Sequence, residues 1–472
     1  MKAVISIVFL LTALTAGATV NRQNHDTDSA LTRQIQIQLT GRQAESSLYF
    51  PHSVIRFYEQ RGFAAAWIGP QNETGRAWQA MLMIDCVLQF GLSHNDFHPA
   101  ELLYSKLHNI MDAVQTPVSE KAHFDILLTD AIITFMNYLH YGKLNPYYLT
   151  IQIDNGLKGN LQADVYLNTV IDHKSLISDI AAVQPQNKLY ADMQEQLHLL
   201  KSLYLDDCYE VPEADVRRLA VDMERLRWDS PDDSTYIQIN IPSYTLTYYR
   251  PDTSYLFKVV VGKPATPTPT LSSAIRYFTT SPEWRVPQKI FVKELLPKAL
   301  ADTAYLSNNH FTIYNKNGGY VPGTVANLTE IKKHPSAFHI QQSAGCDNAL
   351  GSIVFRFDNI YDIYLHDTPE QQLFASDKRT FSHGCIRVEH AENLAVLLLQ
   401  NDGSANKIDL LRKTISRYKK TNFTLKRPVP IYVTYLTCMV KDGILVTFDD
   451  PYNLDKSLEM AIYGVNNILS RR

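Results

Sequence analysis

The chain has almost no excess of charge of either sign. Its 472 residues include 45 Lys and Arg against 48 Asp and Glu, which gives a net charge of −3. Proteins that bind nucleic acid through phosphate contacts usually carry a clear positive excess, so no nucleic-acid partner is expected. Hydrophobic residues make up 45% of the chain, which excludes a disordered protein, and the length allows two or three domains.

Cysteine is scarce. Disulfide-stapled scaffolds carry more cysteines at closer spacing, so disulfides are not expected to define this fold. An odd number also calls for a thiol with a role of its own, and a catalytic Cys385 would supply one. The sequence does not fix the pairing of the others. The five are Cys86, Cys208, Cys346, Cys385 and Cys438.

Long apolar runs are absent beyond the first residues. Lys2 precedes an apolar run from Ala3 to Leu14, and small residues follow up to Ala18. This pattern predicts a secretory signal peptide over residues 1–18, cleaved after Ala18, with an uncleaved anchor as the alternative. No later run is long enough to span a bilayer, so the mature protein is expected to be exported, without a stable membrane span.

The first half of the chain shows helical periodicity, and we expect a mostly helical domain over residues 25–228. Its clearest helix runs from Ser119 to Tyr141, with apolar residues on one face and Gly142 placed to end it. His94 and His98 lie in an earlier turn and are expected to be surface residues rather than metal ligands.

From Tyr236 onward the apolar period changes to two, which predicts strands and a β-rich domain over residues 235–428. Residues 294–343 interrupt this pattern with helical and irregular sequence. Residues 429–472 are expected to form C-terminal strands and a helix. The predicted fold class is therefore α+β, with a helical N-terminal domain before a β-rich one.

The segment Phe381–Val388 reads Phe-Ser-His-Gly-Cys-Ile-Arg-Val and carries the strongest chemical signal. A second histidine, His366, follows a β-like run from Ile360 to Leu365. A thiol becomes a useful nucleophile when a base removes its proton and donors stabilise the oxyanion that it creates. The alternatives are a buried structural cysteine and a zinc site, although no spacing typical of zinc ligands is present. Such a zinc site would use His366, His383, Cys385 and His390.

Several groups in and around these two segments suggest roles in nucleophilic catalysis. His366 is the candidate base for Cys385, and the backbone N–H groups of Gly384 and Cys385 are candidate oxyanion donors. Tyr364 shares a strand face with His366, so its hydroxyl either donates to the same site or packs in the core. Arg387 either binds a substrate carboxylate or pairs with Glu389.

The ordered set of His366, a 15-residue gap, and Ser382-His383-Gly384-Cys385 with Arg387 resembles the L,D-transpeptidase (YkuD) family, in its large periplasmic branch. The resemblance implies a periplasmic enzyme that forms 3→3 cross-links between peptidoglycan stem peptides. The reaction would pass through a Cys385 thioester, carbapenems would acylate the same thiol, and neither metal nor organic cofactor is needed. Other cell-wall enzymes are candidate partners.

The resemblance also implies roles for further residues. The backbone carbonyl of Asp367 would orient the His366 ring, although its carboxylate is an alternative in the residues themselves. His383 would hold the thiolate region, and residues 294–343 would form a lid. Substrate-binding positions would be Arg387, Ser382, Trp284 and Asn348.

Two departures from the family leave the acyl acceptor and the anchoring of murein open. No room exists for a peptidoglycan-binding insert between Tyr204 and Leu219, and Gln341 and Ala344 replace a usual arginine and proline. The alternatives are an L,D-carboxypeptidase, D-amino-acid exchange, or attachment of proteins to the wall by the same acyl-enzyme. A non-catalytic wall-binding protein and a zinc amidase are alternatives of other classes.

Overall fold

The computed structural model describes residues 29–41, 47–69, 74–112, 116–203, 214–229, 231 and 233–464. The predicted signal segment 1–18 and Cys208 lie outside them. The chain forms two compact units, which we call the helical unit and the sheet unit. The helical unit contains Met1–Asp232, Thr437–Thr447 and Asn453–Arg472, and the sheet unit contains Asp233–Leu436 and Phe448–Tyr452.

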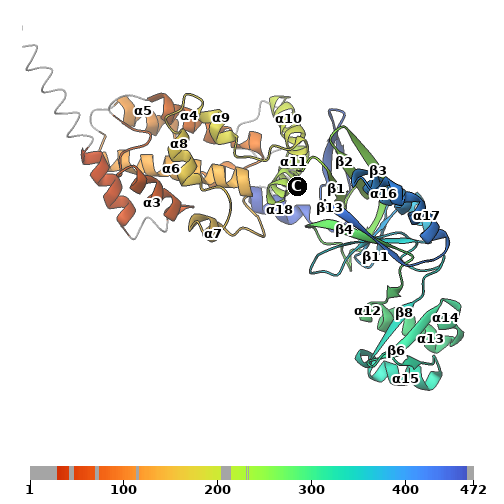
Figure 1. The fold of residues 1–472 in the computed structure, drawn as a ribbon. Helices are drawn as coiled ribbons and strands as arrows, with labels where there is room; N and C mark the ends of the chain where they lie inside the picture. The colour runs from red at the N-terminus through yellow and green to blue at the C-terminus, as the bar shows by residue number, and fades with distance from the viewer. Residues whose placement is uncertain are drawn as a thin grey trace, which may run out of the picture. The chain divides into compact units, whose positions relative to one another are not determined.

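Helix α6 (Val118–Tyr141) is the centre of the helical unit (Figure 1). The sequence predicted one apolar face, but the structure buries this helix on nearly every side, including Asp125 and Asp130. Gly142 ends the helix as expected, with a positive φ of 85° that favours glycine. The helices that contact α6 are α3 (Pro51–Gln60), α4 (Thr74–Asp85), α8 (Ala163–Val170), α9 (Leu176–Ala181) and α11 (Ala214–Trp228).

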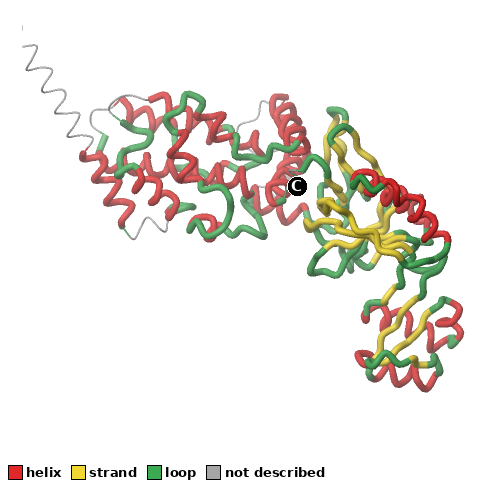
Figure 2. The backbone as a smooth tube through the Cα atoms, viewed as in Figure 1, coloured by secondary structure: helices red, strands yellow, loops and turns green. Residues whose placement is uncertain are grey.

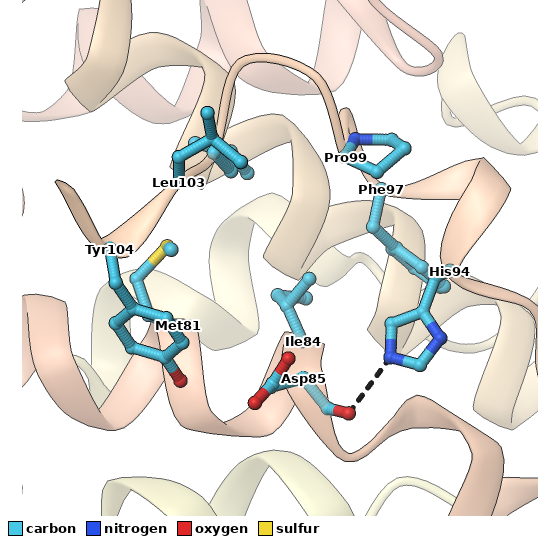
Figure 3. Close-up of a pocket in the computed structure, with 9 residues that line it drawn as sticks. Met81, Ile84, Asp85, His94, Phe97, Pro99, Leu103 and Tyr104 are labelled. Carbon is cyan, nitrogen blue, oxygen red and sulfur yellow. Dashed lines mark hydrogen bonds between the residues drawn. The ribbon is translucent and has the colours of Figure 1, made fainter. Parts of the chain in front are cut away.

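The two histidines expected at the surface are not exposed, since His94 is buried and His98 is half-buried. His94 is 8% exposed, and its Nε2 lies 2.8 Å from the Asp85 carbonyl, in the wall of a small pocket (Figure 3). The Nε2 atom of His98 lies 2.7 Å from Oδ2 of Asp130 on α6. The prediction of surface positions was wrong because both rings satisfy buried polar groups, a role that local sequence does not reveal.

None of the helices among the described residues is long and apolar enough to cross a membrane. Further helical segments belong to the helical unit. They are α5 (Tyr104–Asp112), α7 (Thr150–Asp154), α10 (Lys188–Leu203) and two 3₁₀ turns, Val87–Phe90 and His94–Asp96.

The sheet unit is built on a nine-stranded sheet with the order β11-β3-β12-β10-β9-β4-β13-β1-β2. Because β2 also pairs with β3, the sheet closes on itself. Two helices cover its core, α16 (Ala391–Asn401) and α17 (Ile408–Ser416), and Figure 2 shows them beside the strands. The strands are β1 (Tyr236–Asn240), β2 (Thr245–Arg250), β3 (Thr253–Gly262), β4 (Leu271–Thr280), β9 (Ile353–Phe357), β10 (Leu365–His366), β11 (Thr380–Ser382), β12 (Ile386–Val388) and β13 (Thr421–Thr434).

The interruption predicted over residues 294–343 belongs to an ordered insertion that begins earlier, at Trp284, and has its own core and a four-stranded sheet (Figure 1). The sequence predicted helices and irregular segments there but missed the strands, since two of them have only two residues. The strands are β5 (Trp284–Arg285), β6 (Phe311–Asn315), β7 (Tyr320–Val321) and β8 (Phe338–Gln342). The helices are α12 (Gln288–Ile290), α13 (Leu296–Ala301), α14 (Ala304–Asn308) and α15 (Val325–Lys333).

The C-terminal part does not stand apart as residues 429–472. Strand β13 runs through Thr434 within the main sheet, whereas β14 (Cys438–Lys441), β15 (Ile444–Thr447) and α18 (Asp455–Tyr463) belong to the helical unit. The α+β class, with a helical N-terminal region before a β-rich domain, is confirmed.

Candidate active site

Two short parallel strands bring the two motif segments together. In the pairing of β10 with β12, Leu365 lies opposite Ile386 and His366 opposite Arg387. The N–H of Ile386 also donates to the Tyr364 carbonyl at 3.1 Å, which places Tyr364 beside Cys385. Leu365 and Ile386 are fully buried in the core, and side chains alternate along a strand. The neighbouring side chains Tyr364, His366, Cys385 and Arg387 therefore share the opposite face.

The β-like run predicted from Ile360 to Leu365 is mostly a turn. Only Leu365 and His366 form a strand there, while Ile360 is 90% exposed and Asp362 has a φ of 53°. The side chain of Asn359 holds this turn, because its amide donates to the Ile363 carbonyl at 2.8 Å. The alternating pattern was misleading because a turn exposes apolar side chains that a strand would bury.

Tyr364 lies beside the Cys385 thiol, and both its hydroxyl and its backbone N–H act to lower the pKa of Cys385. The indole N–H of Trp284 acts on the same hydroxyl and opposes the rise of the Tyr364 pKa caused by burial. Of the two readings of Tyr364 left open by the sequence, the structure favours a hydroxyl in the site.

The resting thiol is protonated. Burial raises the pKa of Cys385, while the hydrogen bonds from Tyr364 and the charges of Arg356 and Arg387 oppose that shift. Burial also raises the pKa of the Tyr364 hydroxyl. A base is therefore needed before Cys385 can act as a nucleophile.

His366 is held as a neutral imidazole. Its Nδ1 lies 2.5 Å from the Asp367 carbonyl, and since a carbonyl only accepts, Nδ1 carries the proton and Nε2 is left as the basic atom. Burial lowers the pKa of His366 to about 3, and the Arg387 charge acts in the same direction.

The structure decides between the two predicted roles of Asp367. Its backbone carbonyl orients His366, whereas its carboxylate turns away and accepts from the backbone N–H and hydroxyl of Ser352, both at 2.8 Å. A side chain at Gly351 would collide with this carboxylate at 2.5 Å, so glycine is required there.

Cys385 and His366 share a face but are not joined by a hydrogen bond among the bonds of the described residues. Tyr364 is the neighbour that acts on the pKa of the thiol instead. Catalytic hydrogen bonds are often long without substrate and tighten in the reacting complex, so this geometry leaves the base role of His366 open to experiment.

Ser382 and Gly384 shape the turn that presents the thiol. The Ser382 hydroxyl is buried, accepts from the Gly384 N–H at 3.1 Å and donates to the Cys385 carbonyl. Gly384 adopts a φ of 119°, which favours glycine. The Gly384 N–H expected as an oxyanion donor is thus already engaged, and Ser382 is a structural residue rather than one open to substrate.

His383 and Arg387 each contact a glutamate rather than the Cys385 thiol. The Nε2 atom of His383 lies 2.6 Å from Oε1 of Glu294 in the insertion. Arg387 pairs with Glu370, not with Glu389, and its buried Nε has no hydrogen-bond partner. His383 therefore contacts the insertion in place of the predicted thiolate region. Arg387 pairs with a carboxylate of the protein, that of Glu370, in place of the predicted substrate carboxylate.

Asn348 was expected to bind substrate but is fully buried. Its amide donates to the Ser343 carbonyl at 2.8 Å, and its carbonyl accepts from the Leu350 N–H at 2.9 Å. It therefore supports the turn that carries Leu350, whose carbonyl opposes the lowering of the His366 pKa by burial.

Sequence reasoning missed a set of residues that hold the cysteine turn from the loop after β3. Thr268 is buried, and its hydroxyl accepts from the Gly262 N–H at 2.9 Å and donates to the Gly384 carbonyl at 2.8 Å. Tyr452 donates to the Gly262 carbonyl at 2.7 Å. Glycine is required at position 262, because a Cβ there would lie 2.2 Å from the Thr266 carbonyl oxygen.

The zinc alternative finds no support in the described residues, where no three His, Cys, Asp or Glu side chains are grouped to hold a metal. Of the cysteines within them, Cys346, Cys385 and Cys438 take part in no disulfide.

Comparison with known proteins agrees with this geometry. Residues 234–429 match the family model described as the L,D-transpeptidase catalytic domain (YkuD), and residues 52–197 match the model of the Scaffold domain. A Haemophilus influenzae protein named "Putative L,D-transpeptidase" is 27% identical over 435 residues, which cover 90% of this chain and 83% of that protein. The chain therefore combines an N-terminal Scaffold domain with a YkuD catalytic domain and belongs to the L,D-transpeptidase family.

Proposed function

We propose that the protein is a periplasmic cysteine L,D-transpeptidase that forms 3→3 cross-links between peptidoglycan stem peptides. The observation that carries the proposal is the shared face of Cys385, Tyr364 and His366, with the imidazole proton fixed on Nδ1 by the Asp367 carbonyl. A neutral base beside a protonated thiol is what thiol acylation requires.

In the first step, Nε2 of His366 takes the thiol proton as Sγ of Cys385 attacks the carbonyl carbon of the third stem residue. The Tyr364 hydroxyl, polarised by the Trp284 N–H, supplies a donor to the developing negative charge. Collapse of the tetrahedral intermediate breaks the C–N bond, and the imidazolium returns its proton to the departing D-alanine amine. A thioester remains on Cys385.

In the second step, the side-chain amine of another stem peptide attacks the thioester carbonyl. His366 takes a proton from that amine, the C–S bond breaks, and the sulfur regains its proton. The insertion over residues 294–343 is the proposed lid, and its Glu294–His383 contact is where it meets the cysteine turn. A lid that excludes water favours the amine acceptor over hydrolysis.

The test is intact-mass and product analysis of the mature protein with a disaccharide-tetrapeptide donor, with a carbapenem as a second acylating agent and Cys385→Ala alongside. We expect an adduct on wild type alone, followed by a cross-linked dimer. Tripeptide without dimer would make water the acceptor and the enzyme an L,D-carboxypeptidase. Absence of both adduct and turnover would favour a wall-binding protein.

A further inference from the structure

A single row of side chains crosses four strands at the level of the nucleophile. Tyr277 on β4 lies opposite Arg356 on β9, and the β9–β10 register continues so that Arg356 lies opposite Tyr364. The β10–β12 register in turn places Tyr364 beside Cys385. Directly opposite residues point to the same face of a sheet, so Arg356 and Cys385 share a face, two strand spacings or about 10 Å apart.

Arg356 is the one side chain of this row that carries a fixed charge, and the proposed reaction gives it no role. Its guanidinium carbon lies 5.1 Å from the centre of the Tyr364 ring. Among the described residues it forms neither an ion pair nor a side-chain hydrogen bond, so all of its N–H donors remain for a ligand. A guanidinium presents these donors in a planar fork that matches a carboxylate.

The space beside Arg356 is a groove. Its lining includes Arg276, Tyr277, Arg356, Asp358, Asp362 and Tyr364. The charges at its rim differ from Arg356 in their surroundings. Arg276 faces Asp358 at 3.6 Å, and both side chains are largely exposed, as is Asp362. Water screens the charges of such an exposed pair, so Arg276 would bind a ligand carboxylate only weakly. Arg356 is half-buried against an aromatic ring beside the thiol, where its charge is screened less.

We propose that Arg356 binds a carboxylate of the donor peptide in this groove and selects donors that carry one. The inference rests on the proposed function, because it assigns a subsite to the same acylation reaction. A donor stem offers such a carboxylate from two sources. One is the terminal carboxylate of the departing residue, and the other is a carboxylate at the end of the third residue's side chain.

The experiment measures the rate of thioester formation, as kcat/KM, with three donors. One has both carboxylates free, one has the side-chain carboxylate amidated, and one has the terminal carboxylate amidated. The proteins are wild type, Arg356→Gln, Arg356→Lys and Arg412→Gln. Arg412 is a matched control, since its exposed side chain pairs with Glu392 on the same unit.

We expect amidation at one of the two positions to lower the wild-type rate by about 10- to 100-fold, the value of a charge-assisted hydrogen-bonded pair. Arg356→Gln should lose as much on the free donor and show no further loss on that amidated donor. Arg356→Lys should keep part of the discrimination, and Arg412→Gln should match wild type. The position whose amidation matters identifies the source.

Two outcomes would overturn the subsite. One is an equal loss by Arg356→Gln on all three donors, which would mean that Arg356 only supports the Tyr364 ring. The other is an Arg356→Gln variant that still distinguishes the free donor from the amidated donors as strongly as wild type does. In both cases wild type still forms the acyl-enzyme, and the proposed function survives. If wild type formed no thioester with any donor or with a carbapenem, the function and the subsite would fail together.

Discussion

At the scale of single residues, the site depends on two hydrogen bonds that adjust neutral groups rather than on an ion pair. Tyr364 directs its hydroxyl at the thiol, and the Asp367 carbonyl fixes the proton of His366 on Nδ1. Burial favours the protonated thiol and the neutral imidazole, whereas the contacts with Tyr364 and the Asp367 carbonyl shift the two pKa values in the opposite directions. Proton transfer is then part of the attack, not a step completed beforehand.

Tyr364→Phe removes the hydroxyl that bonds to Cys385 and accepts from Trp284. We expect acylation of Cys385 to slow by about 10- to 100-fold, because the developing charge loses a preorganised donor. Stopped-flow or mass-resolved acylation by a carbapenem measures the effect. Tyr361→Phe, an exposed tyrosine in the adjacent turn, is the control and should react like wild type. Equal rates for the two variants would mean that Tyr364 is only a packing residue.

The pH dependence of thiol alkylation tests the neutral pair. Since the pKa of Cys385 is raised, the iodoacetamide rate should keep rising through pH 9. The pKa of His366 is lowered to about 3, so the base stays neutral above about pH 4 and should add no acidic limb to acylation between pH 5 and 8. An alkylation rate that is already constant at pH 6 would instead indicate a thiolate–imidazolium pair.

At the scale of elements, the cysteine turn is held by the loop between β3 and β4 through one hydroxyl. Thr268→Val keeps the shape but leaves the Gly262 N–H and the Gly384 carbonyl without their partner. We expect a loss of about 1–3 kcal/mol in the free energy of unfolding of the sheet unit, together with slower acylation. Urea unfolding measures the first.

Thr268→Ser retains the hydroxyl and should recover most of the stability. Thr266→Val removes a longer bond of 3.3 Å to the Ser382 carbonyl and should cost less. If the valine variant at position 268 were as stable as wild type, the turn would not depend on this hydroxyl.

The sequence located the site because its groups lie in two short segments, around His366 and around Cys385, at the ends of adjoining strands. It named the Tyr364 hydroxyl only as one of two alternatives, because the choice depends on the register of two strands of two and three residues, too short to display a period. Arg356 escaped notice since it reaches the site from a third strand. The strands of the insertion were not predicted, because two of them have only two residues and display no period.

At the scale of the whole molecule, the helical unit is completed by residues far along the chain. Asp455 on α18 accepts from Arg225 on α11 at 2.6 Å and from the Thr437 hydroxyl at 2.6 Å. Asp222 on α11 accepts from the Cys438 N–H at 2.7 Å. These buried bonds join the C-terminal hairpin and helix to the N-terminal helices.

Asp455→Ala removes one acceptor from a nearly buried arginine. We expect a loss of about 1–3 kcal/mol in the stability of the helical unit, less than for a fully buried pair because the Asp455 side chain is 18% exposed. Denaturant unfolding followed by a probe in each unit should show only the helical transition moving. Asp409→Asn, on α17 of the sheet unit, is the control. A shift of the sheet-unit transition alone would contradict this division of the chain.

The return of the chain to the helical unit sets an order for biosynthesis. Residues 214–228 leave the ribosome well before residues 437–464, with the whole catalytic sequence between them. Helix α11 must therefore wait with Asp222 and Arg225 uncovered until the later segment arrives. A chain that stopped before residue 437 would keep its thiol and its motif yet lack the bonds from Asp455 and Cys438 that complete the helical unit.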